Sequence, residues 1–353
     1  MNQQWYLHNT GQCKGSEGED VKAFEAWKIS QGGSEKIVIA ILDDGVDVSH
    51  PDLKDNIWIN PNQNALDRHG YNFVDHTSDP SPVYFSPPYN DSSHNDIHGT
   101  ACAGVAAASG NSGGPLGIAY KCKILPVKVF GENGIVADLD FSEAIKYAGN
   151  YSDVINCSFY TKVSNVATTA INEVVSSGRK GLGCIIIAAS GNSPFYQDSI
   201  AYPALLSSKS FPLIAVGAST NQGLRADYSH YGPELDLLAP SSGGTLGILT
   251  TDVSIPGYGY NNGKNGEPDK EGLYTDKFGG TSASAPLVAG IAALVLSIKP
   301  SLRSAQVRDI LSESCDKIDP QNAKYDDSGF SITHGYGRIN AKKALDLALL
   351  SQE

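Results

Sequence analysis

Four polar residues of this sequence adjoin apolar segments, where a fold can hold reactive side chains firmly. Asp43 ends the run IVIAILD, and His98 begins the small-residue stretch HGTACAG. Asn192 closely follows the run CIIIAA, and Ser282 precedes the long apolar segment ASAPLVAGIAALVLSI. A carboxylate, an imidazole, an amide and a hydroxyl are the parts of a serine acyl-transfer site. Their types and settings therefore predict nucleophilic catalysis.

Each of these residues alone has a simpler structural interpretation. Asp43 by itself is typical of a turn after a strand, His98 of a capping or core histidine, and Ser282 of a helix N-cap. A Ser-Gly-Asn sequence such as that ending at Asn192 is commonly just a turn. If these structural interpretations were correct, four unrelated residues would have to match a catalytic pattern by chance at the same time. The set as a whole therefore favours the catalytic interpretation. Cys102, which follows His98 on the same helical stretch, is interpreted as a thiol packed near the imidazole rather than a second nucleophile.

Apolar strands and helices alternate along the chain and would position these side chains. The expected strands lack polar alternation, as in a parallel sheet covered on both faces, and span 36–43, 123–130, 153–158, 183–190 and 211–218. The expected helices span 21–30 with Asp20 as cap, 139–149 with Asp138 as cap, 165–177 ending at Gly178, and a buried 282–298. This order predicts an α/β fold with a mostly parallel central sheet and helices on both faces. Reactive groups should gather at the carboxyl ends of its strands.

Composition restricts the class of protein. The 353 residues include 26 Lys and Arg against 38 Asp and Glu, for a net charge of −12, and 41% are hydrophobic. That hydrophobic content suffices for a large core, and the acidic balance argues against nucleic acid or an anionic membrane as partner. No uninterrupted apolar stretch approaches the ~18 residues of a membrane span. The 6 cysteines form no CxxC pair, so we expect reduced thiols and no zinc site.

Two segments are expected to be surface loops. Residues 76–96 are rich in proline and polar residues, and residues 254–278 are rich in Gly, Asn and charge without periodicity. Neither is suited to link separate domains, so one domain over residues 1–353 is predicted.

In the order Asp, His, Ser, these motifs resemble those of the subtilisin-like serine peptidases, or subtilases. The resemblance runs from about Gln4 to Leu349 and is carried by LDDGVDVSHPDL, HGTACAG and GTSASAPLVAG. Three features are similar to the kexin/furin branch: WYL near the N-terminus, the LDDG form of the first motif, and Cys102. The sequence GPELD, by contrast, is similar to bacterial subtilisins. The resemblance implies a subtilisin-like three-layer sandwich and a serine endopeptidase that works through an acyl-enzyme.

The resemblance also assigns roles. Ser282 would be the nucleophile, His98 the general base, and Asp43 the group that orients the imidazole. Asn192 and the Ser282 backbone N–H would receive the oxyanion. Two alternatives stay open: a peptide ligase or macrocyclase that uses the same acyl-enzyme, and a catalytically blocked peptide-binding protein.

A structural calcium ion is a further implication of the resemblance. Its ligands would be the Asp52 carboxylate, the Asn111 side chain and the backbone carbonyls of Ser109, Gly113 and Pro115. Oxygen ligands from a loop suit a hard cation. The family takes another ligand from the N-terminal arm, and none is assigned before Trp5. The alternative is a loop closed by hydrogen bonds without metal.

Substrate-binding residues carried over from the family are Ser158, Phe159, Tyr160, Ala189, Gly191 and Ala201. Ile200 stands where kexin-type enzymes keep an acid, and Tyr160 where the family usually has glycine. A desolvated arginine would lack a partner there, so an uncharged P1 side chain is expected. The nearby Asp198 keeps a basic P1 residue as the alternative.

The expected partner is a peptide or protein substrate, and the protein is expected to be a monomer. The N-terminus has no signal-peptide pattern, and neither the family's propeptide nor the C-terminal P-type domain of kexins is expected within this chain. A propeptide or inhibitor acting in trans would then replace the missing propeptide. Family analogy implies secretion or a periplasmic location, and the lack of a signal peptide leaves the cytoplasm as the alternative.

Overall fold

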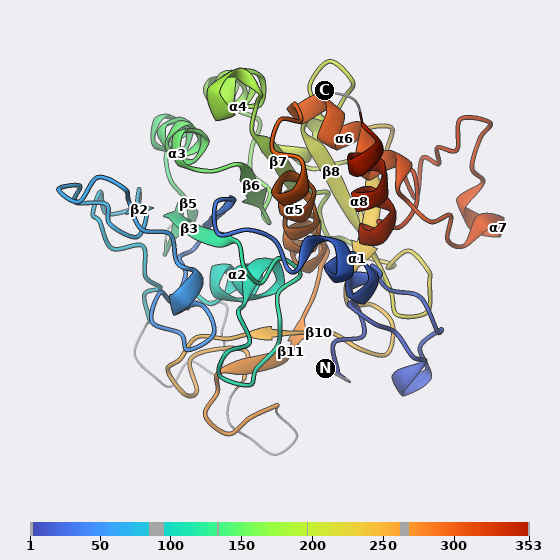
Figure 1. The fold of residues 1–353 in the computed structure, drawn as a ribbon, viewed down its shortest axis with the longest axis horizontal. Helices are drawn as coiled ribbons and strands as arrows, with labels where there is room; N and C mark the ends of the chain where they lie inside the picture. Colours follow the sequence, from blue (N-terminus) through green and yellow to red (C-terminus); the bar gives the residue numbers. More distant parts are fainter. Residues whose placement is uncertain (1–2, 85–94, 133, 196, 262–267, 352–353) are drawn as a thin grey trace.

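Seven strands form the central sheet of the protein, in the order β2-β3-β1-β6-β7-β8-β9. The computed structural model describes residues 3–84, 95–132, 134–195, 197–261 and 268–351 (Figure 1). The strands of the sheet are β1 Val38–Asp43, β2 Tyr71–Asn72, β3 Lys123–Lys128, β6 Val154–Cys157, β7 Ile185–Ala189, β8 Ile214–Ser219 and β9 Leu237–Pro240. Every neighbouring pair is parallel. The five predicted strands and the parallel sheet are therefore confirmed.

Both faces of the sheet are buried, which explains why its strands read as unbroken apolar runs. Successive side chains of a strand point to opposite faces. In β1, Ile39 and Ile41 belong to one hydrophobic cluster, and Ala40 and Leu42 belong to the other. The sheet thus separates two cores.

Helices cover both faces and complete the three layers (Figure 1). The first core contains residues of α1 Ala23–Ser30, α2 His98–Ala107, α5 Thr281–Ile298, α6 Ser304–Glu313 and α8 Ala341–Leu350. The second core contains residues of α3 Asp138–Tyr151 and α4 Asn165–Gly181. The shorter elements are η1 Gln12–Lys14, η2 Lys54–Asn56, η4 Ala204–Leu206, α7 Pro320–Ala323, β4 Phe130–Gly131, β5 Gly134–Ile135, β10 Ile248–Thr251 and β11 Tyr274–Phe278. The predicted α/β architecture is confirmed.

Helix α5 runs through the middle of the molecule, as its apolar sequence predicted. By length and composition it could cross a membrane, but 83% of this segment is buried inside the protein. Such burial is that of the central helix of a folded core.

Several local predictions need correction. Asp20 does not cap α1, because its carboxylate accepts the N–H groups of Asn9 and Lys22, both at 2.8 Å, and the helix begins at Ala23. Asp138 is the first residue of α3 rather than its cap. Gly178 does interrupt α4, where its ψ of 171° is not helical.

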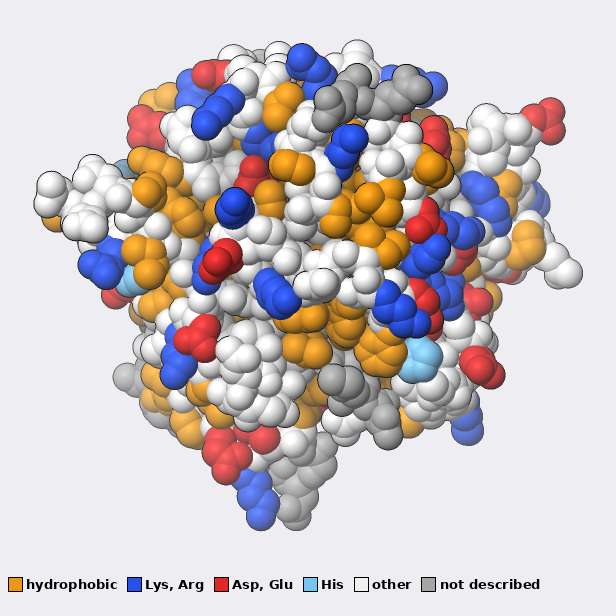
Figure 2. Space-filling view, viewed as in Figure 1, with side chains coloured by type: hydrophobic (Ala, Val, Ile, Leu, Met, Phe, Trp, Pro, Cys, Tyr) orange, Lys and Arg blue, Asp and Glu red, His pale blue; other side chains and the backbone are white. Residues whose placement is uncertain are grey.

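The two predicted surface loops are described only in part. Residues 85–94 of the first and 262–267 of the second lie outside the described residues. The end of the second loop is not irregular, because β11 pairs antiparallel with β10. All six cysteines are unpaired in this structure. Basic and acidic side chains are interspersed on the face shown in Figure 2, so the acidic excess is not gathered into one patch there.

Candidate active site

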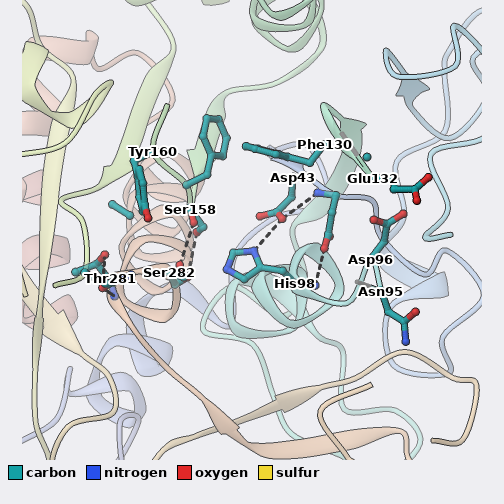
Figure 3. Close-up of a pocket in the computed structure, with 15 residues that line it drawn as sticks. Asp43, Asn95, Asp96, His98, Phe130, Glu132, Ser158, Tyr160, Thr281 and Ser282 are labelled. Atoms are coloured by element: carbon teal, nitrogen blue, oxygen red, sulfur yellow. Dashed lines mark hydrogen bonds and ion pairs between the residues drawn. The ribbon is translucent and has the colours of Figure 1, made fainter. Parts of the chain in front are cut away.

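The fold brings all four candidate residues to one cavity of about 390 Å³. Asp43 ends β1, His98 begins α2, Ser282 lies in the first turn of α5, and Asn192 follows β7. Figure 3 shows the His98 imidazole between Asp43 and Ser282. The other lining residues are Asp44, Asn95, Asp96, Phe130, Gly131, Glu132, Ser158, Phe159, Tyr160, Ala189 and Thr281.

Asp43 and His98 form a short hydrogen bond at the centre of the site. The imidazole Nδ1 lies 2.8 Å from Asp43 Oδ1, and the carboxylate is 4% exposed. With its proton held on Nδ1, the ring presents the lone pair of Nε2 to the cavity. Burial is the strongest single influence and lowers the pKa of His98, but the charge and hydrogen bond of Asp43, together with Cys102, outweigh it and hold that pKa well above the usual 6.5. His98, paired with Asp43, is therefore suited to act as a general base that accepts a proton and holds it.

The second aspartate of the LDDG motif fixes the start of α2. The Asp44 carboxylate accepts the backbone N–H of His98 at 3.0 Å and that of Gly99 at 2.7 Å. These N–H groups at a helix N-terminus have no partner within the helix. A Cβ on Gly99 would lie 2.2 Å from the Gly45 carbonyl oxygen, so only glycine permits this approach. Burial and the nearby Asp43 charge raise the pKa of Asp44 to about 7.

A proline in α5 leaves the backbone carbonyl of Ser282 free to accept hydrogen bonds from outside the helix. Pro286 lies inside α5 and has no N–H, so the Ser282 carbonyl four residues earlier loses its helical partner. Instead, that carbonyl accepts the hydroxyl of Ser158 at 3.0 Å and the thiol of Cys102 at 3.6 Å. Ser158, directly after β6, and Cys102 of helix α2 thereby fix the position of Ser282.

The Ser282 hydroxyl itself donates to the Ser158 carbonyl at 3.0 Å. Within the described part of the chain, no hydrogen bond joins this hydroxyl to His98. Hydrogen bonds of catalytic groups are often formed or shortened only when substrate binds. The arrangement is that of a nucleophile and base placed across the same cavity.

Cys102 packs beside the imidazole, as the sequence predicted. Its sulfur lies 3.7 Å from His98 Nδ1. Burial raises the pKa of the thiol to about 11. Cys102 therefore stays protonated near neutral pH and is a poor nucleophile.

The side chain of Asn192 has a fixed orientation. Its Oδ1 accepts the backbone N–H of Thr281 at 2.8 Å and the Thr281 hydroxyl at 3.0 Å. The amide oxygen is thus tied to the start of α5. No acceptor for its NH₂ group is found in the described part of the chain, so that group can donate to an acceptor in the cavity.

The predicted substrate-binding residues are only partly brought together. Ser158, Phe159, Tyr160 and Ala189 line the cavity, whereas Gly191 and Ala201 are not among its lining residues. The Gly191 N–H bonds to the Thr281 hydroxyl at 3.3 Å, and the Ala201 N–H bonds to the Ser190 carbonyl at 2.9 Å. Ile200 is buried at 7% exposure. Another part of the cavity wall was not predicted from the sequence and is formed by Asn95, Asp96, Phe130, Gly131 and Glu132.

The predicted calcium ligands lie around one loop. Asp52 is fully buried, and the Ser109 N–H bonds to its backbone carbonyl at 2.8 Å. Its carboxylate accepts the Ser112 N–H at 2.6 Å and the Tyr274 hydroxyl at 2.7 Å. No lysine or arginine pairs with this carboxylate in the parts of the chain that the structure describes. A buried carboxylate without a cationic partner fits a hard cation.

The N-terminal arm reaches the same loop through Gln4, which the sequence analysis did not identify. The Gln4 side chain makes two hydrogen bonds to Leu116, from its Nε2 to the carbonyl at 2.7 Å and from the Leu116 N–H to its Oε1 at 3.0 Å. Nothing local in the sequence around Gln4 marks this contact, because its partner lies far along the chain.

Comparisons with known proteins show which family this chain resembles. The family model described as the subtilase family matches residues 34–337. A "Calcium-dependent protease" of Nostoc sp. is 35% identical over 377 residues, covering 100% of this chain and 52% of that protein. A "Dibasic-processing endoprotease" of Schizosaccharomyces pombe is 31% identical over 360 residues, covering 98% of this chain and 45% of that protein.

Solved structures show the same fold. The serine protease of Aeromonas sobria matches with a TM-score of 0.80 at 25% identity, covering 100% of this chain and 67% of that one. The same protease in complex with a chaperone, ORF2, matches with a TM-score of 0.80 at 24% identity and the same coverage of 100% and 67%. The chain therefore belongs to the subtilase family. It spans about half the length of the curated relatives it matches.

Proposed function

We propose that this chain is a serine endopeptidase in which Ser282, His98 and Asp43 form the catalytic triad. The observation that carries the proposal is the 2.8 Å hydrogen bond between His98 Nδ1 and Asp43 Oδ1, in a cavity that Ser282 also lines. Membership of the subtilase family and relatives named as proteases support it.

The proposed reaction has two steps. The Ser282 oxygen attacks the substrate carbonyl while its proton passes to His98 Nε2, and Asp43 stabilises the imidazolium. That proton then goes to the leaving amine as the peptide bond breaks and a Ser282 ester forms. A water molecule next gives its proton to His98 and attacks the ester, which releases the acid and restores the Ser282 hydroxyl.

Asn192 is proposed to stabilise the negative oxygen of the intermediate. Replacing it, in Asn192→Ala, should lower kcat by about 10²–10³-fold with little change in KM, because the lost hydrogen bond strengthens mainly in the transition state. Steady-state kinetics on a peptide substrate measure both constants. A fall in kcat of less than about threefold would show that Asn192 is not an oxyanion donor.

The P1 preference is proposed to be for uncharged side chains. Ile200, the residue that the family resemblance assigns to the pocket floor, is apolar and buried, and Asp198 is exposed. Incubation of the protein with peptides that differ only at P1, followed by mass spectrometry of the products, tests both activity and preference. Hydrolysed fragments support the peptidase proposal, joined peptides would indicate a ligase, and bound but intact peptides would indicate a blocked binding protein.

We also propose a calcium ion at the loop around Asp52. Asp52, Asn111 and the carbonyls of Ser109, Gly113 and Pro115 would hold it, with the Gln4 amide oxygen as the ligand from the N-terminal arm. Asp52 is fully buried and pairs with no lysine or arginine among the described residues, which supports this site, and so do relatives named calcium-dependent proteases. The ion would tie the N-terminal arm to the loop before β3.

Removal of calcium should then destabilise the protein. At free calcium about 100-fold above its Kd, binding adds about 2.7 kcal/mol to the free energy of unfolding. Denaturant titrations with calcium or with a chelator measure this gain, which Asp52→Asn should abolish and the exposed Asp326→Asn should not. Equal stability of the unmodified protein in both conditions would contradict the calcium proposal.

The proposed partners follow from this function. This chain itself supplies Asp43, His98, Asn192 and Ser282 to the cavity, and we propose that it acts as a monomer on a peptide or protein substrate. The Aeromonas sobria protease has been crystallised with a chaperone. A propeptide-like protein acting in trans is accordingly our proposal for a regulatory partner of this chain.

A further inference from the structure

Lys128 is a buried cation close to the active site that the proposed mechanism does not use. It ends β3 and lies beside Asp43 in the parallel register with β1. Its side chain is only 1% exposed, and it is not among the residues that line the catalytic cavity. Burial of an ammonium group is costly unless several partners compensate it.

The Lys128 ammonium has two partners on different segments of the chain. It donates to the Asp44 backbone carbonyl at 2.5 Å and forms an ion pair with the Asp96 carboxylate. Asp44 directly follows the proposed triad aspartate, and Asp96 lies shortly before His98 on the way into α2. One side chain therefore links the two segments that carry the Asp43–His98 pair.

A second link joins the same segments. The Asp44 carboxylate accepts the N–H groups of His98 and Gly99, at 3.0 and 2.7 Å. The Asp96 carboxylate also accepts the Val83 N–H at 2.8 Å, which fixes it from a third side. We call Lys128, Asp44 and Asp96 the lysine clamp.

We propose that Lys128, through the lysine clamp, is a positioning residue that holds the His98 end of α2 in register with Asp43. The proposal rests on the proposed function, because it concerns the efficiency of the same triad. The 2.8 Å hydrogen bond from His98 to Asp43 depends on the relative placement of two segments that are far apart in sequence. Misplacement of reacting groups by about 1 Å can cost about 10²-fold in rate.

The test begins with Lys128→Met, which keeps the length and packing of the side chain but removes the ammonium. We expect kcat to fall about 10- to 100-fold and KM to change less than about threefold. The matched control is Arg308→Met, because Arg308 forms a buried ion pair with Asp236 away from the cavity. That variant should lower the free energy of unfolding while kcat stays within about twofold.

A double variant separates positioning from simple charge compensation. Lys128→Met with Asp96→Asn removes both charges, so no unpaired buried carboxylate remains to unfold the protein. If the lysine clamp positions His98, the kcat of the double variant should stay at least about tenfold below the wild-type value, because Met cannot link Asp44 to residue 96. Recovery to within about twofold of the wild-type kcat would overturn the proposal.

A spectroscopic measurement tests the clamp without turnover. The Nδ1 proton of the 2.8 Å His98–Asp43 hydrogen bond should be strongly deshielded, and it can be assigned in ¹H NMR spectra by its loss in His98→Ala. It should shift or broaden in Lys128→Met and stay unchanged in Arg308→Met. An unchanged resonance in a folded Lys128→Met protein would overturn the clamp, even if the wild-type protein proved to have no peptidase activity.

Discussion

Replacement of Ser282 by alanine should lower kcat for peptide hydrolysis by about 10⁶-fold, the scale found for loss of the triad serine in subtilisin. The variant keeps the cavity and its oxyanion donors but has no oxygen to form the ester. Its KM should stay close to the wild-type value, because the hydroxyl contributes little to ground-state binding. Kinetics with a fluorogenic peptide, with enzyme concentration raised for the variant, measure the loss.

A neighbouring serine provides the matched control. Ser284 lies on the same helix and is buried, and its hydroxyl donates to the Ala239 carbonyl at 2.8 Å. Ser284→Ala should cost about 1 kcal/mol of stability through the lost hydrogen bond and leave kcat within about threefold. A Ser282→Ala protein with appreciable hydrolysis, or a Ser284→Ala protein as inactive as it, would contradict the assignment of the nucleophile.

Replacement of Asp43 by asparagine should lower kcat by about 10⁴-fold, because the amide favours the wrong tautomer of His98 and no longer stabilises the imidazolium. The pH dependence should change as well. In the wild-type protein the Asp43 carboxylate holds the pKa of His98 well above 6.5, so kcat/KM should decline as the pH falls through that raised pKa. Without the carboxylate, burial dominates and lowers the pKa of His98, so the acid limb should move to lower pH.

Profiles of kcat/KM against pH for the two proteins check this expectation. A matched variant is Asp47→Asn, since Asp47 is buried and bonded to Ser49 and Ser254 but lines no part of the cavity. Asp47→Asn should leave the acid limb of the kcat/KM profile at the same pH as in the wild-type protein. An acid limb that stays fixed in Asp43→Asn would show that His98 is not the titrating base.

Much of the fold was predictable because local sequence and burial agree. Strands β1 and β7 are unbroken apolar runs, as expected for a parallel sheet that is buried on both faces. The apolar sequence of α5 likewise predicted its central position. The candidate site was predictable because each motif places one reactive side chain next to such an element. Helix starts were less predictable. Asp20 resembles an N-cap in sequence, yet its carboxylate is occupied by Asn9 and Lys22.

The residues that support the site were not predictable, because their partners are distant in sequence. Gln4 contacts Leu116, and Lys128 contacts Asp44 and Asp96. One feature of the sequence does indicate that Lys128 is unusual: it is a lysine within the otherwise apolar run ILPVKVF. Its partners could be named only once the register of β1 and β3 was known.

Covalent labelling with a fluorophosphonate probe, read by intact-mass and peptide mass spectrometry of the calcium-loaded protein, tests the role of Ser282 most directly. If Ser282 is the activated nucleophile, one adduct should form on Ser282 in the wild-type and Ser284→Ala proteins and be absent from Ser282→Ala. Folded protein that acquires no adduct, or an adduct on a different residue, would contradict the claim that Ser282 is an activated nucleophile.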